Sequence, residues 1–497
     1  MTHASLAGLL DRAELLWPEQ PAAVDGELRW TYRELGDASR AMASALAARG
    51  VGHGDRVAAL CDNHAEFLAL HFAVARLGAI LVPINTRLNA SEVDGIIAFA
   101  GPRVLVADDE HRGSCAASGL LPRELLDTPA QVSLPSPAIR ADEPAQIYFT
   151  SGTTGRPKGV VLTHGNVHAH AVMAIAELAL GERDVWAHVA PMFHLADAWA
   201  SFAITAVGGR HVFLRRFAAR PCLDLLERGR VTVTNLVPTM LTRLVHEPDA
   251  AARDWSAFRV LLSGGAPIAP ATVRRIRETF RCRYVQTYGM TETSPYLTLS
   301  IPLARHNALD DDARLAIAAR TGRPVLGIEL RVVDGHGRDI PRDDRCVGEI
   351  LVRGPTVTPG YWNDPAATAA AFTADGFLRT GDLATQDSGG SVRIVDRKKD
   401  VIKTGGESVF STEVEHRLCE HDAVLEAAVY GEPDEDLGER VVAAVALKPG
   451  AVATAVELVA HCRASLAGFK TPRAIRFVDA LPRTGTGKIS KRLLRGS

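Results

Sequence analysis

The sequence lacks several features that would assign it to common protein classes. Its seven cysteines lie singly, with no Cys-x-x-Cys pair, which argues against a disulfide framework or a zinc site. No run of about 18 apolar residues occurs, and Asp11 and Glu14 interrupt the first apolar stretch, so neither a membrane-spanning helix nor a signal peptide is predicted. Lysine and arginine (56) nearly balance aspartate and glutamate (58), which leaves no basic field for nucleic acid. We expect a cytoplasmic protein with a small-molecule partner, no nucleic acid and no stable membrane association.

Helical and strand patterns alternate along the first hundred residues. Thr31 with Glu34, and Asn89 with Glu92, have the spacing of a capping box, at which a helix begins. Residues 64–77 have helical periodicity. Short apolar runs predict strands at 57–60, 80–84 and 104–106. Strands and helices that alternate at this spacing predict a parallel sheet covered by helices.

A second α/β unit is predicted further along the chain, followed by a small β unit at 330–353. After residue 396 the pattern becomes that of a compact α+β domain of about a hundred residues. The fold class is therefore α/β: a large N-terminal domain of two α/β subdomains with a small β unit, and a small α+β C-terminal domain. The predicted divisions are 1–395, a boundary at 396–400, and 401–497.

A loop rich in glycine and hydroxyl residues lies between two apolar runs. Its glycines allow backbone N–H groups to converge on an anion, and its serine and threonines add hydroxyl donors. It differs from the common P-loop, because Lys158 follows Pro157 and precedes Gly159. A surface loop without a ligand is the alternative. We predict a phosphate-binding loop of another kind, formed by Thr150, Ser151, Gly152, Thr153, Thr154, Gly155 and Lys158.

With its flanking residues, the stretch from Tyr148 to Val161 resembles the phosphate loop of the adenylate-forming superfamily. This superfamily contains acyl-CoA synthetases, carrier-protein-dependent adenylation domains and beetle luciferases. The resemblance covers nearly the whole chain. It implies that the loop holds the β- and γ-phosphates of ATP and moves during turnover.

The segment Tyr288-Gly289-Met290-Thr291-Glu292 is the second match to this superfamily. The resemblance implies that Tyr288 stacks on adenine, that Thr291 contacts the α-phosphate, and that Glu292 helps to hold magnesium. Thr153 of the phosphate loop is the second implied magnesium contact. Magnesium keeps several waters, which suits one carboxylate with substrate phosphates. An ordinary turn with a solvent-facing Glu292 is the alternative.

The same resemblance implies binding roles for two shorter motifs and for Arg397. Asp382, in Thr380-Gly381-Asp382, is implied to bind both ribose hydroxyls, since a carboxylate only accepts hydrogen bonds. Arg397 is implied to contact the nucleotide. Four residues after a predicted strand are implied to lie against the adenine and the acyl chain: Gly264, Gly265, Ala266 and Pro267. Without the resemblance, both motifs are typical of turns.

The C-terminal part carries the remaining implied residues. Lys399 occupies the hinge position, so 396–400 would be a hinge about which a mobile C-terminal domain rotates. Lys403, Gly405 and Gly406 match the loop that lines the tunnel for the pantetheine arm of CoA. Lys488 matches the catalytic lysine that bridges the acid and the α-phosphate as charge develops. A solvated tail is the alternative for Lys488.

The acyl site is predicted around Pro191-Met192-Phe193-His194. The resemblance places His194 near the acyl group, although a histidine beside Met and Phe is as often a core or lid residue. Apolar neighbours favour an uncharged, hydrophobic acid. The predicted pocket residues are His194, Trp199, Leu236, Met240 and Tyr296. Asp197 is the exception, expected to cap the following helix or to meet a polar group of the substrate.

Position 411 departs from the resemblance, because many relatives have proline where this chain has Ser411. Thr412 and Glu415 have the spacing of a capping box, which predicts that a helix still begins there. Nothing catalytic depends on this departure.

Together the residues and the resemblance predict an AMP-forming acid–CoA ligase that uses ATP, Mg²⁺ and coenzyme A. It would adenylate a fatty or other apolar carboxylic acid and then form the CoA thioester. One alternative is a stand-alone ligase that loads an aryl, acyl or amino acid onto a carrier protein. A luciferase-like oxygenase and a nucleotide-binding regulator without turnover are the others, and a homodimer is left open.

Overall fold

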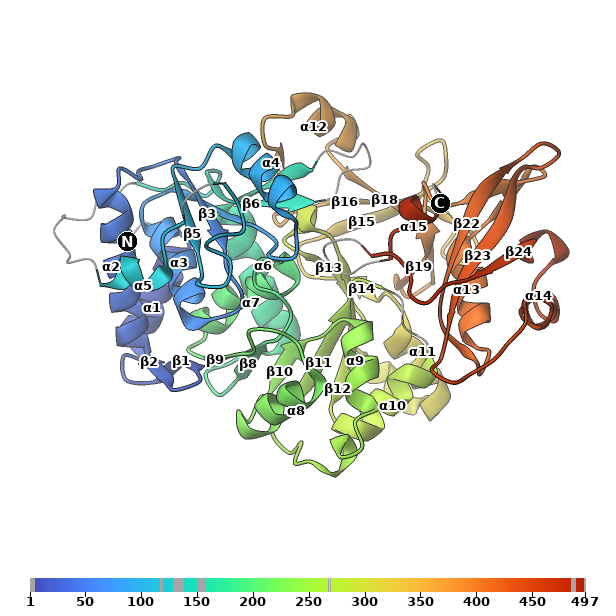
Figure 1. Cartoon of the computed structure of the whole chain (residues 1–497), viewed down its shortest axis with the longest axis horizontal. Helices are drawn as coiled ribbons and strands as arrows, with labels where there is room; N and C mark the ends of the chain where they lie inside the picture. Colours follow the sequence, from blue (N-terminus) through green and yellow to red (C-terminus); the bar gives the residue numbers. More distant parts are fainter. Residues whose placement is uncertain are drawn as a thin grey trace. The chain divides into compact units, whose positions relative to one another are not determined.

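The computed structural model describes residues 5–116, 119–127, 138–150, 157–266, 268, 270–483 and 489–495. The chain divides into two compact units (Figure 1). The first comprises Met1–Glu329 with Arg353–Leu378, and the second Leu330–Val352 with Arg379–Ser497. The hinge expected at 396–400, between 1–395 and 401–497, remains a prediction.

Two sheets form the framework of the first unit. Among the described residues, β8 to β12 run parallel in a nine-stranded sheet, and β3, β4 and β5 run parallel in a six-stranded sheet. Both predicted α/β subdomains are thereby confirmed. In spatial order the larger sheet contains β14 (Arg323–Pro324), β13 (Tyr296–Leu299), β12 (Arg283–Gly289), β11 (Val260–Gly264), β10 (Val233–Asn235), β8 (Val185–His188), β9 (Arg210–Phe213), β1 (Pro21–Asp25) and β2 (Leu28–Thr31). The smaller contains β17 (Gly360–Tyr361), β7 (Lys158–Thr163), β6 (Pro144–Thr150), β4 (Ile80–Pro83), β3 (Arg56–Leu60) and β5 (Val104–Ala107).

Helices cover both faces of both sheets. A central core lies between the sheets and contains α1 (Ala7–Leu16), α2 (Tyr32–Ala48), α3 (Ala65–Arg76), α6 (His164–Leu178) and α7 (Leu195–Ala206). The outer face of the larger sheet packs on α8 (Ala219–Arg228), α9 (Pro238–Val245), α10 (Pro270–Phe280) and α11 (Asp311–Ala319). The outer face of the smaller sheet packs on α4 (Ala90–Ala100). Two short helices complete the unit, α5 (Pro122–Leu126) and α12 (Pro365–Ala371).

The alternation of side chains along buried strands explains this layering. In β3, Val57 and Ala59 belong to the central core, whereas Ala58 and Leu60 belong to the outer one. Successive side chains of a strand point to opposite faces, so an uninterrupted apolar run is buried on both sides. The apolar run at 57–60 is such a strand.

Two of the predicted capping boxes form at helix starts. Thr31 Oγ1 accepts from the backbone N–H of Glu34, whose carboxylate accepts from the N–H of Thr31 at 2.7 Å. Asn89 and Glu92 make the same reciprocal pair at the start of α4. Each pair satisfies two helix N–H groups that have no partner within the helix.

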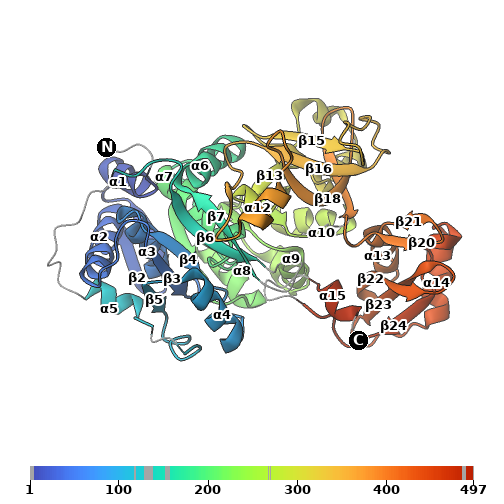
Figure 2. The same cartoon turned by 90° about the horizontal axis from the view of Figure 1, so that it is seen from above.

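The second unit contains two further sheets (Figure 2). One comprises β15 (Glu329–Val333), β16 (Gly348–Arg353), β18 (Leu378–Gln386) and β19 (Val392–Arg397). The other comprises β21 (Glu407–Val409), β20 (Ile402–Thr404), β23 (Gly438–Leu447), β22 (Val424–Asp434) and β24 (Ala474–Phe477). Helices α13 (Ser411–Cys419) and α14 (Ala455–Arg463) pack on one face of the second sheet, and the segment with α15 (Lys491–Leu494) packs on the other. The small α+β domain that the sequence predicts after residue 400 is thus present.

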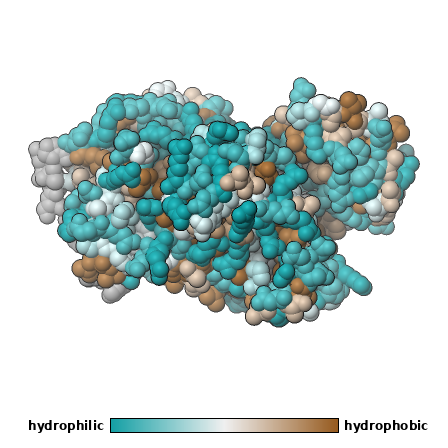
Figure 3. Space-filling model, turned by 90° about the horizontal axis from the view of Figure 1, so that it is seen from below, coloured by the Kyte–Doolittle hydropathy of each residue, from teal (hydrophilic) through white to brown (hydrophobic). Residues whose placement is uncertain are grey.

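Hydrophilic residues cover most of the face shown in Figure 3, and apolar residues form small separate groups there. Some large apolar side chains are well exposed, such as Leu15 and Val452. Within the described residues, no helix is both long enough and apolar enough to cross a bilayer.

We predict that the fold loses stability in mild acid. Burial lowers the pKa of His71 and His170 to about 3 and that of His164 to about 4. An unfolded histidine titrates near 6.5, so below that pH the unfolded chain binds protons that the folded chain does not. Each of the three should cost about 1.4 kcal/mol of unfolding free energy per pH unit below 6.5. Calorimetry at pH 7.5 and 5.0 should show a lower Tm at pH 5.0; an unchanged Tm would contradict this assignment.

Candidate active site

The predicted phosphate loop connects the two strands of a β-hairpin. Strands β6 and β7 are antiparallel, and Thr150 lies directly opposite Lys158. Gly159 lies within β7, where it serves packing and not a turn, because a Cβ would come within 3.0 Å of Ile147 and 3.2 Å of Trp362. Five of the predicted residues lie outside the described residues: Ser151, Gly152, Thr153, Thr154 and Gly155.

Four predicted segments lie at one edge of the nine-stranded sheet. His194 follows β8, Leu236 follows β10, Gly264 ends β11, and Gly289 ends β12. Parallel strands have their carboxyl ends at a common edge, which is where open α/β sheets bind ligands. Sheet topology therefore brings together segments that are far apart in the sequence.

Two glycines at this edge allow backbone contacts that a side chain would prevent. A Cβ on Gly264 would lie 2.2 Å from Thr287 Oγ1 on the neighbouring strand. A Cβ on Gly289 would lie 1.8 Å from the carbonyl oxygen of Pro295. Gly265 has a φ of +85°, which favours glycine. Of the other predicted residues, Ala266 is exposed, Tyr288, Met290 and Thr291 are half-buried, and Pro267 lies outside the described residues.

Glu292 is buried and held by a second segment of the chain. The hydroxyl of Tyr361 donates to its Oε1 at 3.0 Å, and the N–H of Thr358 donates to its carbonyl oxygen at 2.8 Å. The ammonium of Lys158 lies 4.7 Å from the centre of the Tyr361 ring. Burial and the adjacent Glu292 carboxylate raise the pKa of Tyr361. The alternative of a solvent-facing Glu292 is therefore wrong.

Tyr361 connects the two motifs, and the sequence analysis missed it. Its strand β17 pairs with β7 of the six-stranded sheet, whereas Glu292 follows β12 of the nine-stranded sheet. The bond between them thus joins the two sheets beside Lys158. A strand of two residues has no periodicity, so only the dipeptide Pro359-Gly360, whose composition is typical of turns, could have drawn attention to Tyr361.

His194 lies at the start of α7. It is half-buried, and its Nδ1 accepts from the N–H of Ala196 at 3.1 Å. This bond places the ring proton on Nε2 when the imidazole is neutral. His194 is therefore the residue that caps α7.

The four other pocket residues predicted from the sequence belong to two different cores. Trp199 and Tyr296 are in contact in the central core, with ring centres 5.2 Å apart. Leu236 and Met240 pack in the outer core of the larger sheet. His170, which the sequence analysis missed, contacts both Trp199 and Tyr296. The centre of its ring lies 5.4 Å from that of Trp199 and 5.3 Å from that of Tyr296.

Asp197 neither caps α7 nor faces a ligand. Its Oδ1 accepts from Trp186 Nε1 at 3.2 Å, and its Oδ2 lies 2.5 Å from His188 Nδ1. His188 Nε2 in turn lies 2.9 Å from His211 Nδ1. All four side chains are fully buried, and burial raises the pKa of Asp197 and lowers those of His188 and His211. The expected cap is corrected to an internal polar network that fixes the first turn of α7.

The second unit contains the predicted ribose and nucleotide residues as a pair. Asp382 on β18 is directly opposite Arg397 on β19, and Arg397 Nε lies 3.3 Å from Asp382 Oδ1. Asp382 is buried, whereas the arginine side chain is about half exposed. The cation of this pair therefore remains accessible to solvent.

Of the other predicted residues of this unit, Lys399, Gly405 and Gly406 lie in turns, and Lys403 lies on β20. Lys399 lies in the turn after β19. Gly405 and Gly406 form a two-residue turn between β20 and β21, and both have positive φ, as a type I′ hairpin requires. Lys403 Nζ donates to Ser408 Oγ across this hairpin at 2.6 Å. Lys488 lies outside the described residues.

The capping box expected at Thr412 and Glu415 does not form. The Thr412 hydroxyl donates to the carbonyl oxygen of Val395, and the Glu415 carboxylate pairs with Lys491 at 2.7 Å. The start of α13 is instead stabilised by Asp396, whose Oδ2 accepts from the N–H of Ser411 at 2.5 Å and from its hydroxyl at 2.7 Å. A carboxylate at a helix N-terminus satisfies the same donors as a capping box.

The chain is similar to known proteins along nearly its whole length. The AMP-binding enzyme family matches residues 10–362, and the AMP-binding enzyme C-terminal domain matches residues 413–488. The chain belongs to the AMP-binding enzyme family. A feruloyl-CoA synthase from Amycolatopsis sp is 36% identical over 498 residues, covering 99% of this chain and 98% of its own length. A long-chain-fatty-acid–CoA ligase from Thermus thermophilus is 36% identical over 488 residues, which cover 94% of this chain and 90% of that ligase.

A solved structure also resembles this AMP-binding enzyme throughout. O-succinylbenzoate coenzyme A synthetase from Bacillus subtilis, in complex with ATP and magnesium ion, covers 98% of this chain and 98% of its own. Its TM-score is 0.86 at 31% identity. The predicted superfamily and fold class are confirmed, and the predicted ATP, Mg²⁺ and CoA agree with these relatives. Glu292 is buried and oriented by Tyr361, so it could supply the single carboxylate that a magnesium site of this kind needs.

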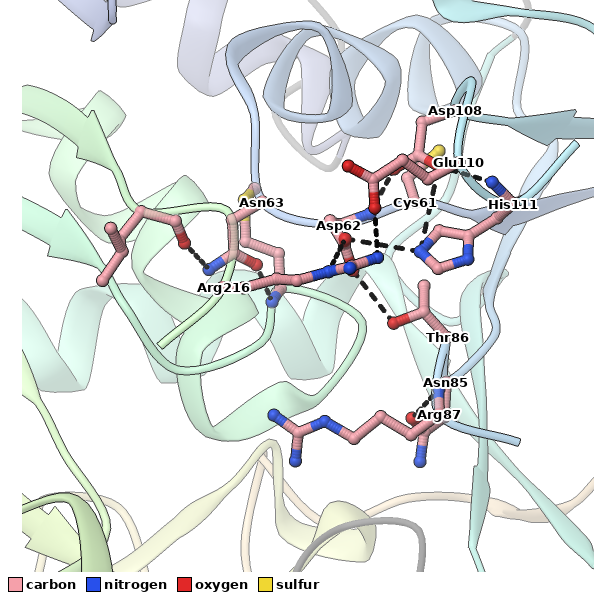
Figure 4. Close-up of polar contacts among 12 residues, drawn as sticks. Cys61, Asp62, Asn63, Asn85, Thr86, Arg87, Asp108, Glu110, His111 and Arg216 are labelled. Atoms are coloured by element: carbon pink, nitrogen blue, oxygen red, sulfur yellow. Dashed lines mark hydrogen bonds and ion pairs between the residues drawn. The ribbon is translucent and has the colours of Figure 1, made fainter. Parts of the chain in front are cut away.

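A second group of potential metal ligands lies at the carboxyl ends of β3 and β5 (Figure 4). Ligand atoms of Asp62, Glu110 and His111 lie within 4.8 Å of one another. Arg216 pairs with Asp62 at 3.0 Å and also with Glu110, so its guanidinium supplies the positive charge there. Burial raises the pKa of Asp62, but hydrogen bonds, the largest from His111, lower it to about 2. This group is an ion-pair network.

Removing the Tyr361 hydroxyl should weaken the response of this AMP-binding enzyme to magnesium. Tyr361→Phe keeps the ring beside Lys158 but leaves Glu292 without its 3.0 Å donor. A hydrogen bond to a charged group contributes about 1.5–3 kcal/mol, so the Mg²⁺ concentration for half-maximal pyrophosphate release should rise about tenfold. Tyr32→Phe is the control, since Tyr32 donates to the carbonyl oxygen of Gly209, away from this edge. Identical magnesium titrations for the two variants would contradict the role of Tyr361.

Proposed function

We propose that the chain is an AMP-forming acid–CoA ligase whose acid is hydrophobic. The observation that carries this proposal is the pairing of a buried, oriented Glu292 with an apolar interior beside His194. The loop that bears His194 follows β8, and the Glu292 segment follows β12, so both belong to one sheet edge. Trp199 and Tyr296 belong to the core next to it.

The proposed chemistry uses few groups. The acid attacks the α-phosphate of ATP and expels pyrophosphate, so two negatively charged groups must meet. Glu292 and Thr153 would hold magnesium, and Lys158 with the rest of the phosphate loop would hold the β- and γ-phosphates. Lys488 would bridge the acid and the α-phosphate. Tyr288 and Thr291 would contact the adenine and the α-phosphate.

The second unit would complete the nucleotide site and then serve CoA. Asp382 and Arg397 already form a pair, which suits a carboxylate that receives two ribose hydroxyls beside a cation that meets phosphate. We propose that 396–400 is a hinge centred on Lys399, joining domains 1–395 and 401–497. Its rotation would bring Lys403, Gly405 and Gly406 to the pantetheine arm for the second step.

The acid is proposed to lack an amine. A ligase for amino acids needs a carboxylate near the α-amine, and the sequence offered Asp197 as a residue that could meet a polar group of the substrate. Asp197 is fully buried between Trp186 and His188, which removes this support for an amino acid. The location is proposed to be cytoplasmic, which the scattered cysteines without a Cys-x-x-Cys pair support.

We predict acid-dependent pyrophosphate release with hydrophobic acids. A panel of aliphatic, aryl and amino acids should be assayed with ATP and Mg²⁺, each with and without CoA. Fatty or aryl acids should support release, and CoA should convert the adenylate to a thioester. Pyrophosphate release without formation of a CoA thioester would favour a carrier protein as acceptor. Release with amino acids alone would contradict the proposed substrate class.

We predict that Lys488→Ala separates the two half-reactions. Loss of one preorganised donor to developing charge typically costs about 10²–10³ in rate. ATP–pyrophosphate exchange should fall by this factor, whereas thioester formation from supplied acyl adenylate and CoA should be retained. Arg492→Ala is a matched control, since it removes an exposed positive charge four residues later. Equal loss of both half-reactions in Lys488→Ala would refute this division.

A further inference from the structure

Asn63 joins the loops that follow two neighbouring strands of the larger sheet. It is 2% exposed, in the loop between β3 and α3. Its Nδ2 donates to the carbonyl oxygens of His188 at 3.0 Å, Ala190 at 2.9 Å and Leu214 at 3.2 Å. Its Oδ1 accepts from the N–H of Met192 at 2.7 Å. One side chain thus contacts four backbone groups, at the end of β8, in the loop after it and after β9.

The chemistry of these contacts requires an amide. The two protons of Nδ2 are shared among three carbonyl oxygens, and Oδ1 accepts from one N–H, so the amide has one allowed orientation. A carboxylate would face the three carbonyls with no proton to give. An apolar residue would remove the Asn63 bonds to the carbonyls of Ala190 and Leu214 and to the N–H of Met192, whereas the carbonyl of His188 would keep the N–H of Leu214. Buried backbone groups without partners cost free energy, so the segment 188–192 would have to rearrange.

The residue before Asn63 fixes this loop to the smaller sheet. Asp62 accepts from the hydroxyl of Thr86 at 3.0 Å and from Arg216 Nε at 3.0 Å (Figure 4). Its own N–H donates to Asp108 Oδ2 at 2.8 Å. Thr86 follows β4 and Asp108 follows β5. The loop that contains Asn63 itself follows β3, so it is held at the ends of three strands.

The opposite end of the His194 segment is held as well. Asp197, on the first turn of α7, is bound to Trp186 and His188 of β8. His194 therefore lies between two fixed points, the Asn63 contacts at 188–192 and the Asp197 contacts on the helix. The Asn63 contacts lie at the carboxyl end of β8 and in the segment after it, whereas Asp197 lies on the helix that follows His194.

We propose that Asn63 is a positioning residue for the acyl side of the site. This inference rests on the proposed function, in which His194 and its loop border the acid. Asn63 holds the backbone of 188–192 and acts on the acid only through this loop. Because the nucleotide motifs lie on β11 and β12, loss of Asn63 should affect the acid and spare ATP.

The test compares Asn63→Ala with Gln20→Ala. Gln20 is a matched control, because its Nε2 also donates to two backbone carbonyls, those of Glu182 and Gly208, which precede β8 and β9. A displacement of about 1 Å can cost up to about a hundredfold, so KM for the acid should rise about tenfold or more in Asn63→Ala. KM for ATP should stay within about twofold, and Gln20→Ala should change neither.

Hydrogen–deuterium exchange gives a second readout that does not need activity. Peptides covering 188–196 should exchange faster in Asn63→Ala than in Gln20→Ala, because the Met192 N–H loses its acceptor. If Asn63→Ala does not fold, Asn63→Ser, which retains one hydroxyl at this position, takes its place in both measurements.

The outcomes separate the two proposals. Unchanged exchange at 188–196, or equal rises in both KM values, would overturn the role of Asn63. Wild-type protein that releases no pyrophosphate with any acid would overturn the proposed function, and the exchange result would still decide whether Asn63 fixes the loop.

Discussion

Residues 355–361 hold Glu292 through hydrogen bonds from Thr358 and Tyr361, and the arrangement of the candidate active-site edge depends on these bonds. Thr358 donates to the backbone of Glu292, Tyr361 donates to its carboxylate, and Ser294 donates to the carbonyl oxygen of Thr356 at 2.8 Å. The same segment pairs with β7 of the other sheet. A carboxylate that is oriented before a cation arrives needs less reorganisation when charge develops. The two sheets are therefore joined at the point where charge must be controlled.

Elements that depend on neighbouring residues could be predicted from the sequence. The capping boxes at Thr31 and Asn89, the buried strand at 57–60 and the parallel sheets all follow from local spacing and periodicity. The nucleotide motifs belong here too, because glycines mark close backbone contacts. Gly264 and Gly289 were identified by motif, and the structure shows that a side chain at either would collide with an adjacent strand or turn.

Features that depend on distant partners could not be predicted in this way. The helix at 411 begins where Asp396 and Lys491 bind its first turns, so the local capping-box spacing did not decide the outcome. Tyr361 lies on a strand too short for a pattern, and its partner is 69 positions away. Asp197 has the spacing of a cap, but burial next to Trp186 and His188 gives it a different role. In each case tertiary contact overrode the local preference.

The nucleotide side and the proposed acyl side are constrained in different ways. At Gly264 and Gly289 the limit is backbone against backbone, which tolerates no added atom. Trp199 and Tyr296 pack through ring contacts, and side chains of similar volume can be exchanged in such a core for less than about 1.5 kcal/mol. Relatives named for feruloyl and long-chain fatty acids are equally similar to this chain, which fits a fixed nucleotide edge with a replaceable acyl lining. A residue such as Asn63, which holds the backbone at 188–192 through its side-chain amide, should then vary less than the proposed acyl lining.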